Sequence, residues 1–175
     1  YNMIRSITIA MTVAVLEVLN SCSVKYSTTG ARIEPGASTV NVRFIQNRAP
    51  INNPTLSQKL TQKLRDKITS QTSLTQVNEN ETRADYELRA TITGYSFSNA
   101  AVTNVDQAAT SRLNVTVNVV FIKRIADKKG FTQSFSRSAE FPATQLPSTV
   151  ENNLLESTII PGITDDIFNR AFANW

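Results

Sequence analysis

The sequence contains no histidine and only one cysteine among its 175 residues. Histidine is the usual general base near neutral pH and a common zinc ligand, so its absence excludes Ser-His-Asp and Cys-His catalysis and histidine-based zinc sites. No glycine-rich phosphate-binding loop is present either. We therefore expect no enzyme activity, no metal site and no cofactor.

Carboxylates are the remaining candidates for acid–base chemistry, because two of them suffice for a glycosidase. The candidate groups are Asp165 with Asp166, Glu151 with Glu156, and Glu79 with Glu81 and Asp85. Asp165 and Asp166 are helix neighbours that point apart, and the group at Glu79 lies in a polar loop. We expect solvated surface carboxylates. A hydrolase would instead require a cleft with two facing acids.

The single cysteine, Cys22, follows a short apolar segment near the beginning of the sequence. Arg5 supplies one positive charge, and ten residues, mostly apolar, run from Ile7 to Leu16. This order is typical of a secretory signal, and the segment is shorter than the ~20 residues that a membrane-spanning helix needs. We predict that residues 1–21 contain a cleaved lipoprotein signal peptide. Met3 is the expected start residue, preceded here by Tyr1 and Asn2.

The residues before Cys22 also predict its modification. Leu19 stands three positions before it and the small Ser21 directly before it. This region resembles a bacterial lipobox, whose cysteine receives a diacylglycerol and often a further acyl chain such as palmitate. Several chains hold a protein durably at a membrane, because each buried methylene contributes about 0.8 kcal/mol. We predict that Cys22 is the lipid attachment site; a buried free thiol is the alternative.

Residues 22–38 contain two glycines and a proline without hydrophobic periodicity, and we interpret them as a lipidated tether. The positions after the cysteine, Ser-Val-Lys, lack the aspartate that retains lipoproteins at the inner membrane, which favours the periplasmic side of the outer membrane. Residues 39–175 should form one domain, since no repeat or long linker divides them. The net charge of +4 is modest and spread along the chain, so we expect no nucleic-acid partner.

Alternating apolar residues predict an antiparallel sheet with one buried and one polar face. The expected strands cover residues 39–45, 85–97, 112–125 and 131–141, with a further short strand at 74–77. In the first of them, Val40, Val42 and Phe44 should share the buried face. The sequence Asp-Lys-Lys-Gly at residues 127–130 has the composition of a hairpin turn between the last two strands.

Two helices are expected beside this sheet. The first begins with Asn53 as N-cap and Pro54 at its first position, and carries an apolar residue at every fourth position: Leu56, Leu60, Leu64 and Ile68. The C-terminal helix should begin at a capping box of Ser148 and Glu151, and Pro161-Gly162 should break or kink it. The expected fold is α+β, a two-layer sandwich in which a mostly antiparallel sheet of about four strands is covered on one face by two helices.

Two groups of basic residues are candidates for binding anions. The first is a stripe on the first helix, Lys59, Lys63 and Lys67, where like charges four positions apart repel one another. The second lies at the tip of the last hairpin: Lys123, Arg124, Lys128 and Lys129. Charge-assisted contacts to phosphate are strong, although either group also has a plain interpretation as a solvated face. Neither group has the interleaved aromatic residues that nucleic-acid stacking needs.

The sequence resembles the LptE family of lipopolysaccharide-assembly lipoproteins from the lipobox to its last residue. The matching stretches are "NRAPINNPTLSQKLTQKLRDKITSQTSL" at 47–74, "ITGYSFS" at 92–98, "SRLNVTVNVVF" at 111–121, "QSFSRSAEF" at 133–141 and "DIFNRAFANW" at 166–175. None of these motifs is catalytic. Their order and spacing carry the resemblance.

The resemblance implies an outer-membrane lipoprotein that plugs the LptD β-barrel and assists lipopolysaccharide assembly and membrane biogenesis. It also implies a small sheet covered on one side by two helices. Lipid A carries phosphates, so the hairpin residues Lys123, Arg124, Lys128 and Lys129 are our candidates for lipopolysaccharide contacts, from charge and position alone. The alternative is a periplasm-facing lipoprotein accessory subunit of another envelope transport system, with the same tethered module and no barrel.

Overall fold

The computed structural model describes residues 30–51, 53–99, 109–125 and 129–173. The expected signal peptide, residues 22–29 of the tether with Cys22, and Lys128 lie outside the described residues. The strands are β1 (Thr39–Val42), β2 (Gln46–Asn47), β3 (Thr75–Gln76), β4 (Tyr86–Asn99), β5 (Thr110–Lys123) and β6 (Phe131–Pro142). The helices are α2 (Pro54–Gln71), α3 (Pro147–Leu154), the π-helical segment η2 (Leu155–Ile159) and α4 (Ile160–Phe172).

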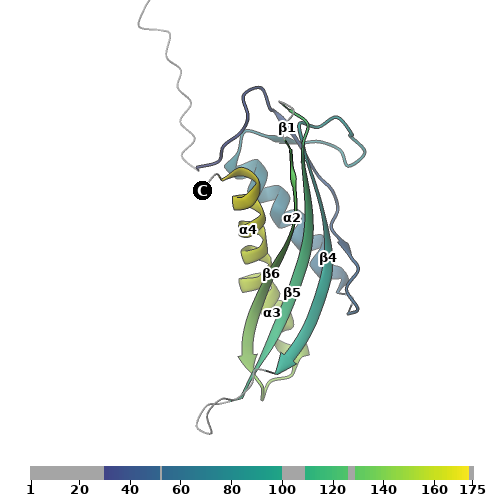
Figure 1. The fold of residues 1–175 in the computed structure, drawn as a ribbon. Helices are drawn as coiled ribbons and strands as arrows, with labels where there is room; N and C mark the ends of the chain where they lie inside the picture. Colours follow the sequence, from purple (N-terminus) through teal and green to yellow (C-terminus); the bar gives the residue numbers. More distant parts are fainter. Residues whose placement is uncertain (1–29, 52, 100–108, 126–128, 174–175) are drawn as a thin grey trace, which may run out of the picture.

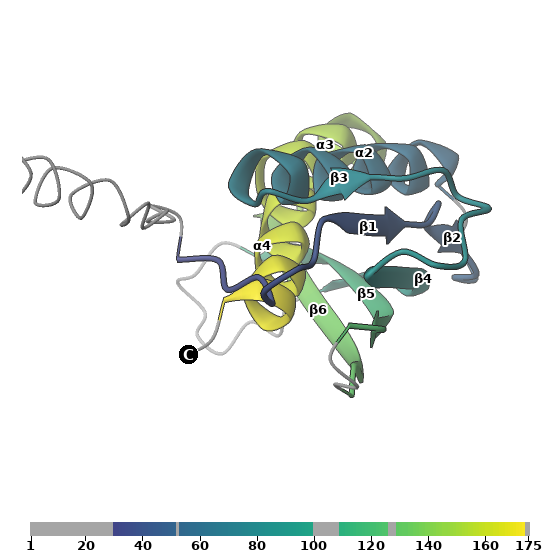
Figure 2. The same cartoon turned by 90° about the horizontal axis from the view of Figure 1, so that it is seen from above.

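The three long strands β4, β5 and β6 form an antiparallel meander, and the helices cover one face of it (Figures 1 and 2). The complete strand order is β3-β1-β4-β5-β6, with β2 also paired to β4. The expected α+β class with helices on one face of a sheet is therefore confirmed. Among the described helices, none combines the length and the hydrophobicity needed to cross a membrane.

The number and direction of the strands differ from the expectation. The sheet is mixed and has six strands, because β1 runs parallel to both β3 and β4, and β2 runs parallel to β4. The chain leaves β1 and β2, passes through α2 on the helical layer, and returns to the sheet in the same direction. A crossover through a helix produces parallel neighbours, whereas a hairpin produces antiparallel ones.

The predicted first strand, residues 39–45, is formed only over β1, and its alternation changes phase after Val42, before β2 begins. Val40 and Val42 are buried as expected, but Phe44 is 47% exposed and Ile45 is fully buried. The backbone N–H of Ile45 donates to Oγ1 of Thr61 in α2, at 3.0 Å, instead of to a neighbouring strand. This contact turns the chain toward the helical layer and exchanges the two faces.

The core lies between the sheet and the helices. The predicted stripe of α2 is entirely buried: Leu56, Leu60, Leu64 and Ile68. The predicted inner face of β5 is also buried: Leu113, Val115, Val117, Val119 and Phe121. In β4 the register shifts between Ile92 and Gly94, so that Tyr95 faces the core in turn. At Gly94 a Cβ atom would lie only 3.1 Å from Cβ of Thr116, so glycine permits the close approach of β5.

The C-terminal helical segment begins and continues differently from the expectation. Leu146 is the N-cap of α3 and makes no side-chain cap, so the predicted capping box of Ser148 and Glu151 does not form. The expected break at Pro161-Gly162 is instead a π-helical turn directly before it, in which the N–H of Ile160 bonds to the carbonyl of Leu155. A π turn widens the helix locally, and Pro161 then falls in the first turn of α4, where its missing N–H costs little.

Candidate functional site

Two of the four predicted hairpin residues line a cavity at one end of the molecule. Lys123 ends β5 and Lys129 precedes β6, and both face a cavity of ≈ 780 Å³. Two arginines also line the cavity: Arg32, near the start of the described chain, and Arg170, near its end. We call this cavity the basic pocket. Its four cations share it with one carboxylate, that of Glu34, so it favours anionic ligands.

The segment that follows the tether forms one wall of the basic pocket. Ala31 pairs with Ala173 in an isolated antiparallel bridge, and the N–H of Arg32 donates to the carbonyl of Phe172 at 2.7 Å. The N–H of Glu34 donates to the hydroxyl of buried Tyr86 at 3.0 Å. The described ends of the chain therefore meet at the same pole as the hairpin.

Two aromatic residues, Phe131 and Phe172, line the basic pocket, and cation–π contacts restrain two of its cations. Phe121 contacts Phe131 and Phe172, each with ring centroids 5.4 Å apart. The guanidinium of Arg170 lies over the ring of Phe131, 4.8 Å from its centroid, and Nζ of Lys123 lies 5.9 Å from that of Phe121. Such cation–π contacts restrain the charged groups without neutralising them. The pocket thus combines apolar surface with positive charge.

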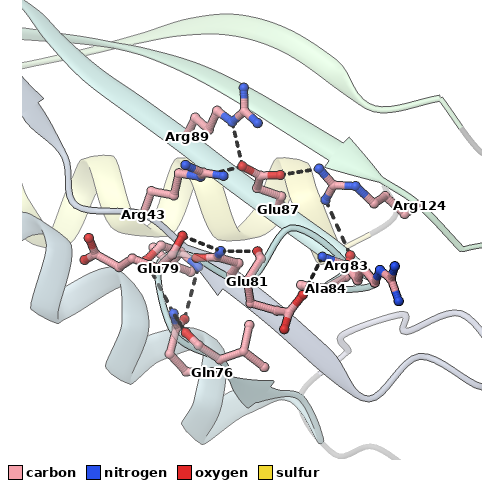
Figure 3. Close-up of polar contacts among 12 residues, drawn as sticks. Arg43, Gln76, Glu79, Glu81, Arg83, Ala84, Glu87, Arg89 and Arg124 are labelled. Atoms are coloured by element: carbon pink, nitrogen blue, oxygen red, sulfur yellow. Dashed lines mark hydrogen bonds and ion pairs between the residues drawn. The ribbon is translucent and has the colours of Figure 1, made fainter.

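Arg124 lies elsewhere, on the face of the sheet that the helices leave open. Its Nη2 donates to Oε2 of Glu87 in β4, and its backbone N–H donates to the carbonyl of Asp85 at 2.9 Å. Two further arginines contact the same carboxylate: Oε1 of Glu87 accepts from Nε of Arg43 at 2.5 Å and from Nε of Arg89 at 2.6 Å. We call these four residues the arginine cluster (Figure 3).

Glu87 is fully buried, whereas the three arginine side chains are between a third and a half exposed. Burial raises the pKa of Glu87, but hydrogen bonds from Arg89, Arg124 and Arg43 outweigh this effect and lower the pKa from 4.5 to about 2. The carboxylate is therefore charged throughout the physiological range. Glu87 lies within the strand expected at residues 85–97, but no local sequence pattern indicates its three arginine partners.

The candidate carboxylates are held in separate contacts, mostly with cations. Asp166 receives two bonds from Arg137, Asp165 pairs with Lys67, Glu156 with Lys59, and Glu79 with Arg65. None of these acids lines the basic pocket, and the described residues contain no group of acids suited to a metal ion. In the part of the chain that the structure describes, these four acids each pair with a different cation instead of forming the facing pair that a hydrolase would require. The same contacts show that two lysines of the predicted stripe on α2 are paired with acids of the other helical segments. Lys59 pairs with Glu156 of η2, and Lys67 pairs with Asp165 of α4.

Glu151 departs from the expectation of a solvated surface carboxylate. It is half-buried, and its Oε1 accepts from the hydroxyl of Tyr95 and from Nδ2 of Asn53, the latter at 2.7 Å. Asn53 also caps α2, since its Oδ1 accepts from the N–H of Leu56. Burial and the neighbouring carboxylate raise the pKa of Tyr95. This contact connects the start of α2, strand β4 and helix α3 at the pole opposite the basic pocket.

Comparison with known protein families gives one match, a model described as "LptE: Lipopolysaccharide-assembly", over residues 37–171. The match covers all six strands and the helical segments. The chain belongs to the LptE family. As a member of this family of outer-membrane lipoproteins, it has a general role in lipopolysaccharide assembly rather than a catalytic one. No curated relative matches the sequence.

Several solved structures are similar in part to this LptE-family chain. A hypothetical protein from Chlamydia trachomatis has a TM-score of 0.49 at 12% identity, covering 79% of this chain and 99% of its own. A minor lipoprotein from Acinetobacter baumannii has a TM-score of 0.47 at 16% identity, covering 77% and 95%. A lipoprotein from Neisseria meningitidis has a TM-score of 0.41 at 12% identity, covering 73% and 99%. With TM-scores below 0.5, these similarities carry no argument about function.

Proposed function

We propose that this protein is anchored by a lipidated Cys22 to the periplasmic side of the outer membrane, docks in an LptD-type β-barrel, and contacts lipopolysaccharide through the basic pocket. The family match over residues 37–171 carries the proposal. The position of the basic pocket supports it. Only seven residues lie between Cys22 and Gly30, where the described chain begins, so these two residues are at most about 28 Å apart when the segment is fully extended.

The part of the open sheet face that lies beyond the arginine cluster, toward the pole opposite the basic pocket, supports docking in a barrel, because the lumen of such a barrel is polar. Hydroxyl and amide side chains of β4, β5 and β6 contact one another across this face. The contacts are Asn114 with Ser98, Thr116 with Ser136, and Asn118 with Ser134. These residues retain free hydrogen-bonding capacity for a polar wall. A pull-down from solubilised outer membranes should recover a large β-barrel, identified by mass; recovery of inner-membrane components alone would favour the accessory-subunit alternative.

Replacement of Cys22 tests the anchor. Cys22→Ala removes the only thiol, so we expect the protein to move from the membrane to the soluble periplasmic fraction. Fractionation followed by immunoblotting measures the distribution, and Ser23→Ala is the matched control, which should stay with the membrane. A Cys22→Ala protein that sediments with membranes as fully as the parent would contradict lipid anchoring at this residue.

Charge reversal in the basic pocket tests the contact with lipopolysaccharide. Lys123→Glu combined with Lys129→Glu places two carboxylates where phosphates would bind, so we expect affinity for purified lipopolysaccharide to fall about tenfold or more. The control is Lys63→Glu, a single reversal at an exposed position of α2 away from the pocket. Equal affinity of the double variant and the control, measured by fluorescence titration, would exclude the pocket from this role.

A further inference from the structure

We propose that the arginine cluster is a second anion-binding site, and that Arg43, Arg89 and Arg124 bind the phosphate of an anionic membrane lipid on the open face of the sheet. This site is separate from the basic pocket. The two lie on opposite sides of the base of the β5–β6 hairpin, since Lys123 belongs to the pocket and the next residue, Arg124, to the cluster.

The charges of the cluster do not balance. Three guanidiniums contact a single carboxylate, so two positive charges are left without a partner inside the cluster. The neighbouring acids are engaged elsewhere. Asp85 accepts from the N–H groups of Ser38 and Thr39, both at 2.9 Å, and Glu79 pairs with Arg65. A phosphate monoester carries nearly two negative charges at neutral pH, which matches the surplus.

The donors of the cluster are available and fixed in position. Among the described residues, the side chains of Arg43 and Arg89 form hydrogen bonds only through their Nε atoms, both with Glu87. A guanidinium has five N–H donors, so each of these two arginines keeps its terminal amino groups for a ligand. In Figure 3 the terminal nitrogens of Arg89 point away from Glu87. Arg124 is restrained further, because its Nη1 also approaches the carbonyl of Ala84. Glu87 thus fixes three guanidiniums as its neighbours, and a planar guanidinium is well suited to recognising a phosphate.

The position of the cluster favours a lipid as the source of the phosphate. Glu87 is the second residue of β4 and Arg124 directly follows β5, so the cluster lies at the pole where the described chain begins. With the proposed anchor at Cys22, the seven residues between Cys22 and Gly30 would keep this pole near the membrane surface. The choice of a lipid therefore rests on the proposed anchoring at Cys22, whereas the anion site itself does not.

The site can be tested with soluble probes that do not depend on the anchor. The full chain, kept in uncharged maltoside micelles, is titrated calorimetrically with dihexanoyl phosphatidic acid below its critical micelle concentration. Dihexanoyl phosphatidylcholine is the probe without net charge, and inorganic phosphate is the competitor. All titrations use the Lys123→Glu/Lys129→Glu background, so that the basic pocket does not contribute. A failure of the arginine cluster to bind phosphate can then be distinguished from a failure of the basic pocket to bind lipopolysaccharide.

Arg89→Gln is the decisive variant, because Arg89 is the most exposed of the three arginines. We expect saturable binding of phosphatidic acid, competition by inorganic phosphate, and about a tenfold loss of affinity in Arg89→Gln. The matched control is Arg112→Gln, which removes another half-exposed arginine from β5 and should change affinity less than twofold. If Arg89→Gln fails to melt cooperatively, Arg43→Gln replaces it.

Several results would overturn the inference. The anion site is wrong if phosphatidic acid does not saturate, or if Arg89→Gln and Arg112→Gln bind it alike. The lipid assignment is wrong if inorganic phosphate binds but phosphatidic acid does not, or if phosphatidylcholine binds equally well. Binding of a polyglutamate peptide without binding of phosphatidic acid would identify an acidic protein as the partner instead.

Discussion

Glu87→Ala should lower the free energy of unfolding by about 3–5 kcal/mol, because it leaves three arginines close together without their shared carboxylate. The lost bonds are those to Arg43, Arg89 and Arg124. Urea denaturation followed by circular dichroism measures the change. Glu140→Ala is the matched control: Glu140 pairs with Arg112 at the surface with 54% of its side chain exposed, and such pairs contribute at most about 1 kcal/mol. Similar losses in both variants would contradict a central role for Glu87.

The pH dependence of stability provides a second measurement of the same contact. The pKa of Glu87 is lowered in the folded protein, from 4.5 to about 2. The folded state therefore binds fewer protons than the unfolded state between these values, and the stabilisation is fully present above pH 4.5. It is lost as the pH falls toward 2. Glu87→Gln should show a flatter decline than the parent over this interval, and parallel curves would exclude Glu87 as the source.

Leu64→Asp should prevent folding of the domain. Leu64 is fully buried at the centre of the stripe with which α2 packs on the core, and an aspartate there would bury a charge without a partner. The adjacent Lys63 is exposed, so Lys63→Asp provides a control with the same new residue one position away. We expect a cooperative thermal transition for Lys63→Asp and none for Leu64→Asp. A cooperative transition for Leu64→Asp near that of the parent would show that the packing face is wrong.

The helices and long strands were predictable because each carries a local periodicity. The leucines of α2 recur every four residues and the valines of β5 every two, and both patterns coincide with the buried faces. The parallel pairing of β1 was not predictable from its own four residues, because it depends on the route through α2. The exposure of Phe44 also has a distant cause, the hydrogen bond between Ile45 and Thr61.

The candidate site was predictable only in part for the same reason. Lys123 and Lys129 are close together in the sequence, and their charge and hairpin position were sufficient to single them out. Arg32 and Arg170 come from opposite ends of the described chain and reach the basic pocket only through the pairing of Ala31 with Ala173. The arginine cluster required the register that places β1 and β5 on either side of Glu87, with Asn41 and Ile122 as its direct neighbours. No local pattern encodes that register.

The bridge between Ala31 and Ala173 has a practical consequence for labelling this protein. Ala173 lines the basic pocket, so a fluorescent reporter or affinity tag fused at the C-terminal end would follow closely on this pocket and would compete there with a bound anion. The turn at residues 143–146, which joins β6 to α3 at the far pole, is exposed throughout. Insertion of a short epitope there would report on location and assembly while leaving the basic pocket unobstructed.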